Sequence, residues 1–171
     1  VFTRKQFKGA AEVFPVSSPN NPILLDDGSI IGMIYETNNL FRIDKNSELL
    51  WHNSSTIFHH SMERSHDQHL WTSGIEKAYT YHQPSGKVIP FEDNTLIKVN
   101  IETGKIVCKK SLAEILISNG YRSLLHGYGN EEYSTGKDLF HLNDVEPVKT
   151  NGKFWNQGDL LLSLRHRSMI I

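Results

Sequence analysis

Short apolar runs separated by turn residues make up most of the chain. A β-rich run at residues 29–35 follows an Asp-Asp-Gly turn, which is typical of a strand that begins at a turn. Residues 40–44 alternate between a face with Leu and Arg and a face with Phe and Ile, and a Lys-Asn-Ser turn joins them to an apolar run at 48–51. Alternation with a period of two indicates a half-buried strand. The pattern therefore predicts a β-hairpin over these two runs.

The same layout recurs 56 residues later, where a strand, a turn and a second apolar strand fill residues 96–107. A second repeated pattern is the pair Phe58-His59, which resembles the pair Phe140-His141. Each pair precedes a turn and a later strand. Repeats of short strands at intervals of about 40–50 residues are typical of a β-propeller or a related array. Two loose copies can also arise by chance among β-hairpins, and that alternative remains open.

These patterns predict an all-β protein in which residues 1–171 form part of a single β-propeller domain. Residues 1–27 form a lead-in segment, within which the Pro- and Asn-rich stretch at 17–22 is expected to be a loop. The blade repeats fill residues 28–171, and the last apolar run suggests that they continue beyond the C-terminus.

One short helix is expected at residues 112–119, as an insertion between blade strands. Ser111 and Glu114 have the spacing of a capping box, in which the Ser hydroxyl accepts a hydrogen bond from the Glu N–H. Apolar residues at helical spacing follow, and Gly120 is suited to a left-handed cap at the end.

Composition narrows the class of protein. With 18 Lys and Arg against 19 Asp and Glu, the net charge of -1 argues against nucleic acid or an anionic membrane as the main partner. No apolar run approaches the roughly 18–20 residues of a membrane span. The single cysteine, Cys108, excludes an internal disulfide framework.

Histidine is frequent and unevenly spread, with nine in the chain and five of them between residues 52 and 69. The candidate metal ligands in this segment are His59, His60, His66, Asp67 and His69. A metal site needs three or four converging ligands, and the spacing here matches no specific site. We therefore expect no bound metal, and we expect His52, His66, His69 and His82 to be loop or surface residues.

A second group of polar residues lies near the C-terminus. Alternation along a strand places His141 and Asn143 on one face, and a later strand at residues 160–165 ends in Arg165. An Arg beside a His would form a compact site for sulfate, phosphate or carboxylate, because guanidinium offers a planar fork of donors. The alternative is that Arg165 pairs with an acidic residue of the 140–147 segment in a structural role.

The sequence motifs near the C-terminus are similar to those of a known protein family. The His-x-Asn opening in residues 141–147 and the Ser-x-Arg ending in 158–165 resemble the arylsulfotransferase family, the bacterial aryl-sulfate sulfotransferases that do not use phosphoadenosine phosphosulfate. Residues 58–61, which run into 69–71, look like the double-His blade that precedes this motif in the family. The resemblance covers roughly residue 28 to the C-terminus.

The resemblance implies a six-bladed β-propeller with the active site at its central channel. It implies ping-pong transfer of a sulfuryl group from an aryl sulfate donor to a phenol acceptor, through a sulfo-histidine and without a cofactor. Neutral imidazole is a good nucleophile near pH 7, and fixed donors can stabilise the negative charge on the moving group. The partners would be small molecules, and the location would be the periplasm or the cell envelope.

Site residues are carried over position by position. The catalytic candidates are His59, His60, His141 and Arg165, and the substrate-binding candidates are Asn143 and His166. The resemblance assigns His141 and Arg165 to the sulfuryl oxygens, and Asn143 would orient His141. His59 or His60 matches the channel His of the earlier blade. Adjacent strand residues point in opposite directions, so only one of these two is expected to face the channel.

The chain also departs from the family pattern. Residues 149–157 form a longer insertion than the usual tight turn. The nucleophilic His of the family comes from a blade beyond the Ser-x-Arg strand, so we expect it beyond residue 171 and expect the chain alone, about half a propeller, to be inactive. Two other functions remain open: a non-catalytic propeller that binds an anionic ligand or a protein partner, and a metal-dependent hydrolase or lyase using the histidines at 59–69.

Overall fold

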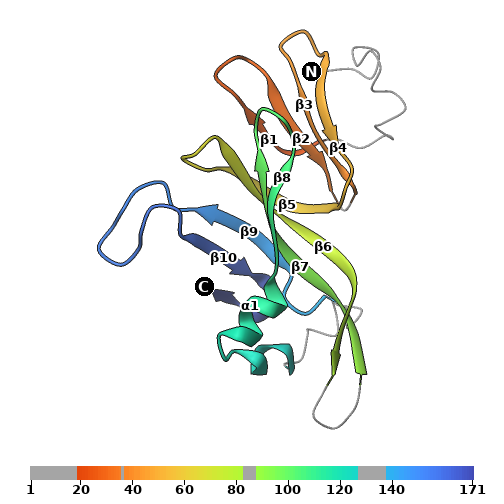
Figure 1. Cartoon of the computed structure of the whole chain (residues 1–171), viewed down its shortest axis with the longest axis vertical. Coiled ribbons are helices and arrows are strands. Elements are labelled where there is room, and N and C mark those ends of the chain that lie inside the picture. Colours follow the sequence, from red (N-terminus) through yellow and green to blue (C-terminus); the bar gives the residue numbers. More distant parts are fainter. Residues whose placement is uncertain (1–18, 36, 83–87, 127–137) are drawn as a thin grey trace.

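The computed structural model describes residues 19–35, 37–82, 88–126 and 138–171, and in these residues the chain folds into three antiparallel sheets and one short α-helix (Figure 1). The first sheet contains β1 (Asn20–Leu24), β2 (Ile30–Ile34), β3 (Asn39–Ile43) and β4 (Leu49–Asn53). The second contains β5 (Ile57–Arg64), β6 (His69–His82), β7 (Val88–Asn100) and β8 (Ile106–Ser111). The third contains β9 (Leu142–Pro147), β10 (Leu160–Leu164) and β11 (Met169–Ile170).

The predicted all-β class and the repeated hairpin are confirmed. The hairpin expected at 40–51 is β3 paired with β4, and the copy at 96–107 belongs to the pair β7 and β8. Both are the last two strands of a four-stranded sheet in which each strand pairs with its neighbours in the chain. The repeat therefore reflects two sheets of the same topology. Over the described residues the three sheets do not close into a ring.

The loop predicted at residues 17–22 is wrong at its C-terminal end, because Asn20–Leu24 is β1. Pro22 is accommodated because β1 is the edge strand of its sheet, where a missing N–H removes no ladder hydrogen bond. The register with β2 also shifts between Asn20 and Ile23. The first 18 residues of the predicted lead-in segment lie outside the described residues.

The predicted helix is confirmed as α1 (Leu112–Ser118), which lies in the chain between the second and third sheets. The Ser111 hydroxyl accepts from the Glu114 N–H at 3.0 Å, as the capping box requires. Gly120 follows with a φ of +85°, which is the left-handed cap that glycine favours. Two 3-10 turns, η2 (Arg122–His126) and η3 (Arg165–Arg167), complete the helical elements of the described chain. None of its helices has the length and apolar character needed to cross a bilayer.

Two apolar clusters hold neighbouring sheets together. The first joins the first two sheets through Leu25, Ile31, Met33, Leu40, Phe58, Met62, Leu70, Ile97, Val99 and Ile101. The second joins β7 and α1 to the third sheet through Phe91, Leu96, Leu112, Ala113, Leu116, Leu125, Phe140, Leu142, Val145, Leu162 and Leu164. Each fully buried large side chain contributes roughly 1.5–3 kcal/mol. This packing places β5 against both β1 and β9.

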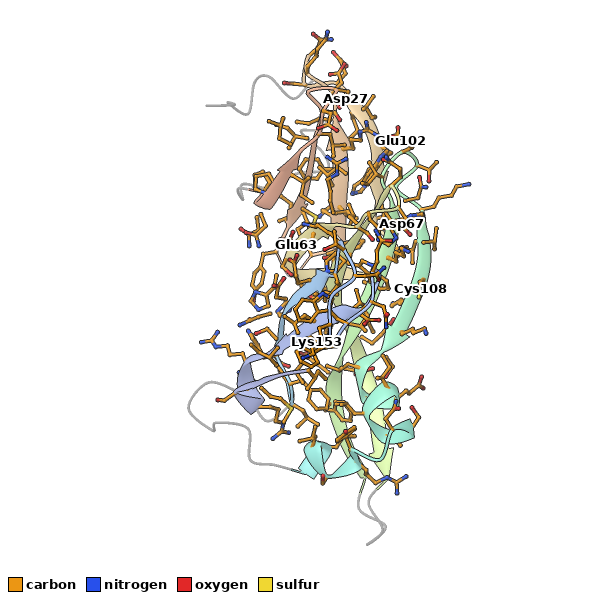
Figure 2. All side chains as sticks on the ribbon, turned by 90° about the vertical axis from the view of Figure 1, so that its left-hand side faces the viewer. Asp27, Glu63, Asp67, Glu102, Cys108 and Lys153 are labelled. Carbon is orange, nitrogen blue, oxygen red and sulfur yellow. The ribbon has the colours of Figure 1, made fainter. Side chains whose placement is uncertain are left out.

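A buried arginine also joins the first two sheets. The Arg42 guanidinium on β3 is 2.7 Å from the Asp27 carboxylate and 2.9 Å from the Glu102 carboxylate. It also donates to the Ile101 carbonyl at 3.1 Å. Figure 2 shows Asp27 and Glu102 toward the same end of the molecule. Because Glu102 lies in the turn between β7 and β8, this network ties that turn to the first sheet.

Candidate functional site

Four histidines from two sheets meet at the starts of β5 and β9. His59 and His60 lie on β5, His141 immediately precedes β9, and His166 lies in η3 after β10. The Nε2 atoms of His60 and His141 are 2.8 Å apart. Ring centroids are 3.9 Å apart for His59 and His60 and 4.6 Å apart for His141 and His166. The structure therefore brings together four of the six residues that sequence reasoning selected.

A break in strand register explains how two adjacent histidines reach one place. The pairing of β5 with β6 moves from His59 opposite Ser73 to Met62 opposite Thr72, so His60 and its neighbour are left out of the ladder. His60 has a φ of +55°, in the left-handed region. Such an irregularity redirects a side chain that regular alternation would send to the other face. The expectation that only one of these two histidines faces the site is therefore corrected: both enter the cluster.

The Asp138 carboxylate orients His141. Its Oδ2 lies 2.6 Å from His141 Nδ1, and its Oδ1 accepts from the His141 backbone N–H at 2.9 Å. A carboxylate accepts hydrogen bonds, so it selects the tautomer with the proton on Nδ1 and leaves a lone pair on Nε2. His60 Nε2 lies 2.8 Å from this atom, so the tautomer of His60 with its proton on Nε2 can donate to that lone pair. Sequence reasoning missed Asp138, although its position three residues before a histidine in a turn was a local signal.

Tyr35, at the end of a strand of the first sheet, contacts the histidine cluster. It follows β2, and its hydroxyl is 3.1 Å from His59 Nε2 and 3.5 Å from His60 Nε2. Its ring stacks on His59 with the centroids 5.1 Å apart. No motif in the sequence links a tyrosine to histidines 24 and 25 positions away, so only the packing of the two sheets reveals this contact.

Burial controls the charge of His59. Its side chain is almost completely inaccessible, with 1% of the residue exposed. The pKa of His59 is lowered to about 4, mainly by burial and in part by the neighbouring His141, while Asp138 acts in the opposite direction. His59 is therefore a neutral imidazole near pH 7.

His166 is held on the other side of His141. Its Nδ1 lies 2.9 Å from the Asp138 carbonyl oxygen. Asp138 therefore contacts His141 through its side chain and His166 through its backbone. The two imidazoles keep a fixed separation because both depend on one residue.

Arg165 and Asn143 lie at the border of the cluster. The Arg165 backbone N–H donates to the His141 carbonyl at 3.1 Å, and its side chain is exposed. In the described part of the chain it forms no ion pair with Asp144 or Glu146, and Glu146 lies 3.7 Å from Lys149 instead. Asn143 is half-buried where the register of β9 with β10 shifts. Asp138, rather than Asn143, makes the hydrogen bond that orients His141.

Two of the histidines expected to be loop or surface residues, His52 and His69, lie in strands and contact nearby residues outside the cluster. His52 Nε2 lies 2.9 Å from Asn39 Oδ1, within the first sheet. His69 Nδ1 lies 2.7 Å from the Asp67 carbonyl. The cluster therefore uses the two histidines at the start of β5 and none of the described ones near the β5–β6 turn.

Two overlapping sets of side chains have the proximity that a metal ion requires. In the set His59, His60 and His141, one potential ligand atom from each lies within 4.8 Å of the others. The same holds for Asp138, His141 and His166. Sequence spacing alone did not identify either set, because His60 and His141 are separated by 81 positions.

The arrangement combines a neutral buried imidazole with an oriented pair of imidazoles, and the exposed Arg165 is joined to it through its backbone. Such a group of donors and lone pairs can bind an oxyanion and can accept or return a proton. A search of curated proteins found no match to the chain. A family model described as Arylsulfotransferase (ASST) matches residues 21–171.

Proposed function

Because the chain belongs to the arylsulfotransferase family, we propose that its histidine cluster binds the sulfuryl group during transfer from a phenolic sulfate ester to a phenol. The observation that carries this proposal is the convergence of His60 and His141 from neighbouring sheets, with Nε2 atoms 2.8 Å apart. Family membership gives the class, a transferase acting on small molecules, and the cluster gives the place where transfer would occur.

The proposal includes a β-propeller as the complete fold. The two four-stranded sheets and the third sheet would be three successive blades, with β1, β5 and β9 as their inner strands. Two contacts support this order: β5 packs against β1 and β9, and the Asn21 side chain of β1 donates to the His60 carbonyl at 3.1 Å. The cluster would then lie at the central channel. The periplasm or cell envelope is proposed as the location from the resemblance alone.

The proposed reaction has two steps. A neutral imidazole attacks sulfur, a nitrogen–sulfur bond forms, and the bond between sulfur and the donor oxygen breaks to release a phenolate. The acceptor phenol oxygen then attacks sulfur, and the nitrogen–sulfur bond breaks to regenerate the imidazole. In this proposal the attacking histidine comes from another blade, and the clustered residues described above would bind the sulfuryl oxygens and handle the acceptor proton.

Each described group has a role that its geometry supports. Arg165 would approach the sulfuryl oxygens from the exposed side of the cluster, where its guanidinium is available. His141 would accept the phenol proton on Nε2 once the phenol takes the place of the His60 N–H, and the Asp138 carboxylate 2.6 Å from Nδ1 would stabilise the resulting charge. Tyr35 would hold the two histidines of β5 in position through its hydroxyl.

The test is sulfuryl transfer by the full-length protein with 4-nitrophenyl sulfate, with and without a phenol acceptor. We expect nitrophenol release that depends on the acceptor and is lost in His141→Ala and Arg165→Ala. His52→Ala, which removes a histidine of β4 outside the cluster, is the matched control and should retain activity.

The opposite result has a specific meaning. Absence of release from a folded, full-length protein across many acceptors would overturn the proposal. It would favour a non-catalytic propeller that binds an anion at the same residues, and sulfate or an aryl sulfate would then be tested as a simple ligand.

A further inference from the structure

We propose that His59, His60 and His141 form a binding site for a divalent transition-metal ion, with Zn²⁺ as the reference ligand. One potential ligand atom from each of the three imidazoles lies within 4.8 Å of the others. Three imidazoles and an open fourth position are a common ligand set for zinc. This inference goes beyond sulfuryl transfer and does not depend on it.

The spacing of the ring nitrogens is close to what a metal ion needs. His60 Nε2 and His141 Nε2 are 2.8 Å apart. Two nitrogens that each bind zinc at about 2.0–2.1 Å in a tetrahedral site are about 3.3 Å apart. The rings therefore need to separate by about half an ångström, with the shared proton leaving as the ion enters.

The surroundings of His141 support the same assignment. A metal-binding histidine usually directs its other nitrogen to a carboxylate, which fixes the ring and raises its basicity. His141 has this arrangement, because its Nδ1 lies 2.6 Å from Asp138 Oδ2 and its Nε2 faces His60. Both side chains are largely buried, with 14% of His141 and 19% of Asp138 exposed. The carboxylate therefore acts as an outer support, not as a ligand.

The ligand chemistry selects the class of ion. Imidazole nitrogen suits Zn²⁺, Ni²⁺ and Cu²⁺, whereas Mg²⁺ and Ca²⁺ prefer oxygen ligands. The overlapping set of Asp138, His141 and His166 is the weaker candidate, because the Asp138 carboxylate already accepts from His141. We therefore assign the ion to the three-histidine set.

An ion at this position would compete with the proposed reaction. The lone pair of His141 Nε2 cannot bind a metal and accept a proton from a phenol at the same time. Resting on the proposed function, this predicts that Zn²⁺ inhibits sulfuryl transfer. Direct metal binding is a separate measurement, so its outcome is independent of whether the protein transfers sulfuryl groups.

The experiment is equilibrium dialysis of the tag-free, full-length protein against Zn²⁺ after removal of metals with a chelator, with metal content measured by mass spectrometry. We expect one ion per chain with a dissociation constant of about 1 μM or lower. His60→Ala and His141→Ala should abolish stoichiometric binding. Asp138→Asn keeps all three ligands and should weaken binding about 10- to 100-fold.

Matched controls separate this site from other histidines and from misfolding. His52→Ala and His69→Ala remove described histidines outside the cluster and should bind zinc as the unaltered protein does. Co²⁺ bound in place of zinc gives a visible absorption spectrum that reports coordination in the folded protein. The proposal is overturned if the unaltered protein binds no stoichiometric Zn²⁺, or if binding persists in folded His60→Ala and His141→Ala variants.

Discussion

At the scale of single residues, burial keeps His59 a neutral imidazole near pH 7. The residue is 1% exposed, and burial lowers its pKa to about 4. An unfolded chain has an unperturbed histidine that titrates near pH 6.5. Between these values the unfolded state binds more protons than the folded state, so the stability contribution of His59 is complete above pH 6.5 and is lost as the pH falls toward 4.

The first prediction concerns this titration. His59→Gln should remove a stability loss on the order of 2–3 kcal/mol between pH 6.5 and 4. The free energy of unfolding in urea, measured at several pH values, checks this result. His52→Ala should keep the pH dependence of the unaltered protein. An unchanged slope in His59→Gln would show that position 59 titrates normally.

A second residue-scale prediction concerns the partner of His141. Asp138→Asn should lower kcat/KM for transfer from 4-nitrophenyl sulfate by at least about tenfold, because an amide NH₂ group at this position can select the wrong tautomer. The pH profile should also change, since the stabilised charge on His141 is lost. Asp26→Asn alters an exposed carboxylate whose side chain is 94% accessible, and it should leave both quantities unchanged.

A positioning role and a purely structural role of Asp138 can be distinguished by experiment. A purely structural role would reduce stability and leave the pH profile of the remaining activity in place. A folded Asp138→Asn protein with the original pH profile would therefore contradict the positioning role.

At the scale of elements, local patterns were sufficient wherever the chemistry was local. The hairpins followed from alternation with turns, and α1 followed from the Ser111 and Glu114 capping box, whose hydrogen bond is present at 3.0 Å. Strand β1 was missed because Asn and Pro normally indicate a loop, and only its edge position makes Pro22 acceptable. The entry of both His59 and His60 into the site was missed because a register shift cannot be read from alternation.

The junction of β7 and α1 contains an unusual buried acid. Asp93 is 1% exposed, and one of its carboxylate oxygens accepts from the Ala113 N–H at 3.1 Å. The pKa of Asp93 is raised to about 6, mainly by burial and in part by Glu114 and Glu76, while hydrogen bonds from Ser111 and Ala113 act in the opposite direction. The folded state therefore holds this proton more tightly than the unfolded state, and stability falls as the pH rises from about 4 to above 6.

The third prediction follows from this sign. Asp93→Asn should raise the free energy of unfolding at pH 8 by roughly 1–3 kcal/mol, because the neutral amide can still accept from Ala113 without a buried charge. The effect should disappear near pH 4. Urea unfolding at pH 8 and pH 4 measures both values, and Ser118→Ala, which changes no charge at an exposed position on the same helix, is the control. Equal destabilisation at both pH values would contradict the assignment.

At the scale of the whole molecule, residues that form sequence motifs could be predicted, whereas contacts between sheets could not. The family and the four clustered histidines were accessible from motifs. Tyr35 was not, since its contact depends on packing of the first sheet against the second, and Asp138 was missed although its place three residues before His141 is a local signal. The proposed zinc site was not predicted for the same reason: spacing along the chain does not report convergence in space.

The fourth prediction tests how the first two sheets are joined. Arg42→Met should destabilise the protein by roughly 1–3 kcal/mol, because it removes bonds to the Asp27 and Glu102 carboxylates and to a backbone carbonyl. Arg42→Lys should recover only part of the loss, since a single ammonium cannot reproduce the guanidinium fork. Urea unfolding measures both variants. Lys45→Met, at an exposed turn position, should lie close to the unaltered protein.

The separation of the clustered residues along the chain also has a consequence in time. The bond between His60 and His141 spans 81 positions. Ribosomes add about 5–20 residues each second, so His141 is synthesised about 4–16 s after His60. During this interval the second sheet can fold, because its strands pair with their neighbours in the chain. The histidine site is therefore completed only during the last part of translation of this region, and any ion or chaperone that meets β5 earlier encounters an open strand edge.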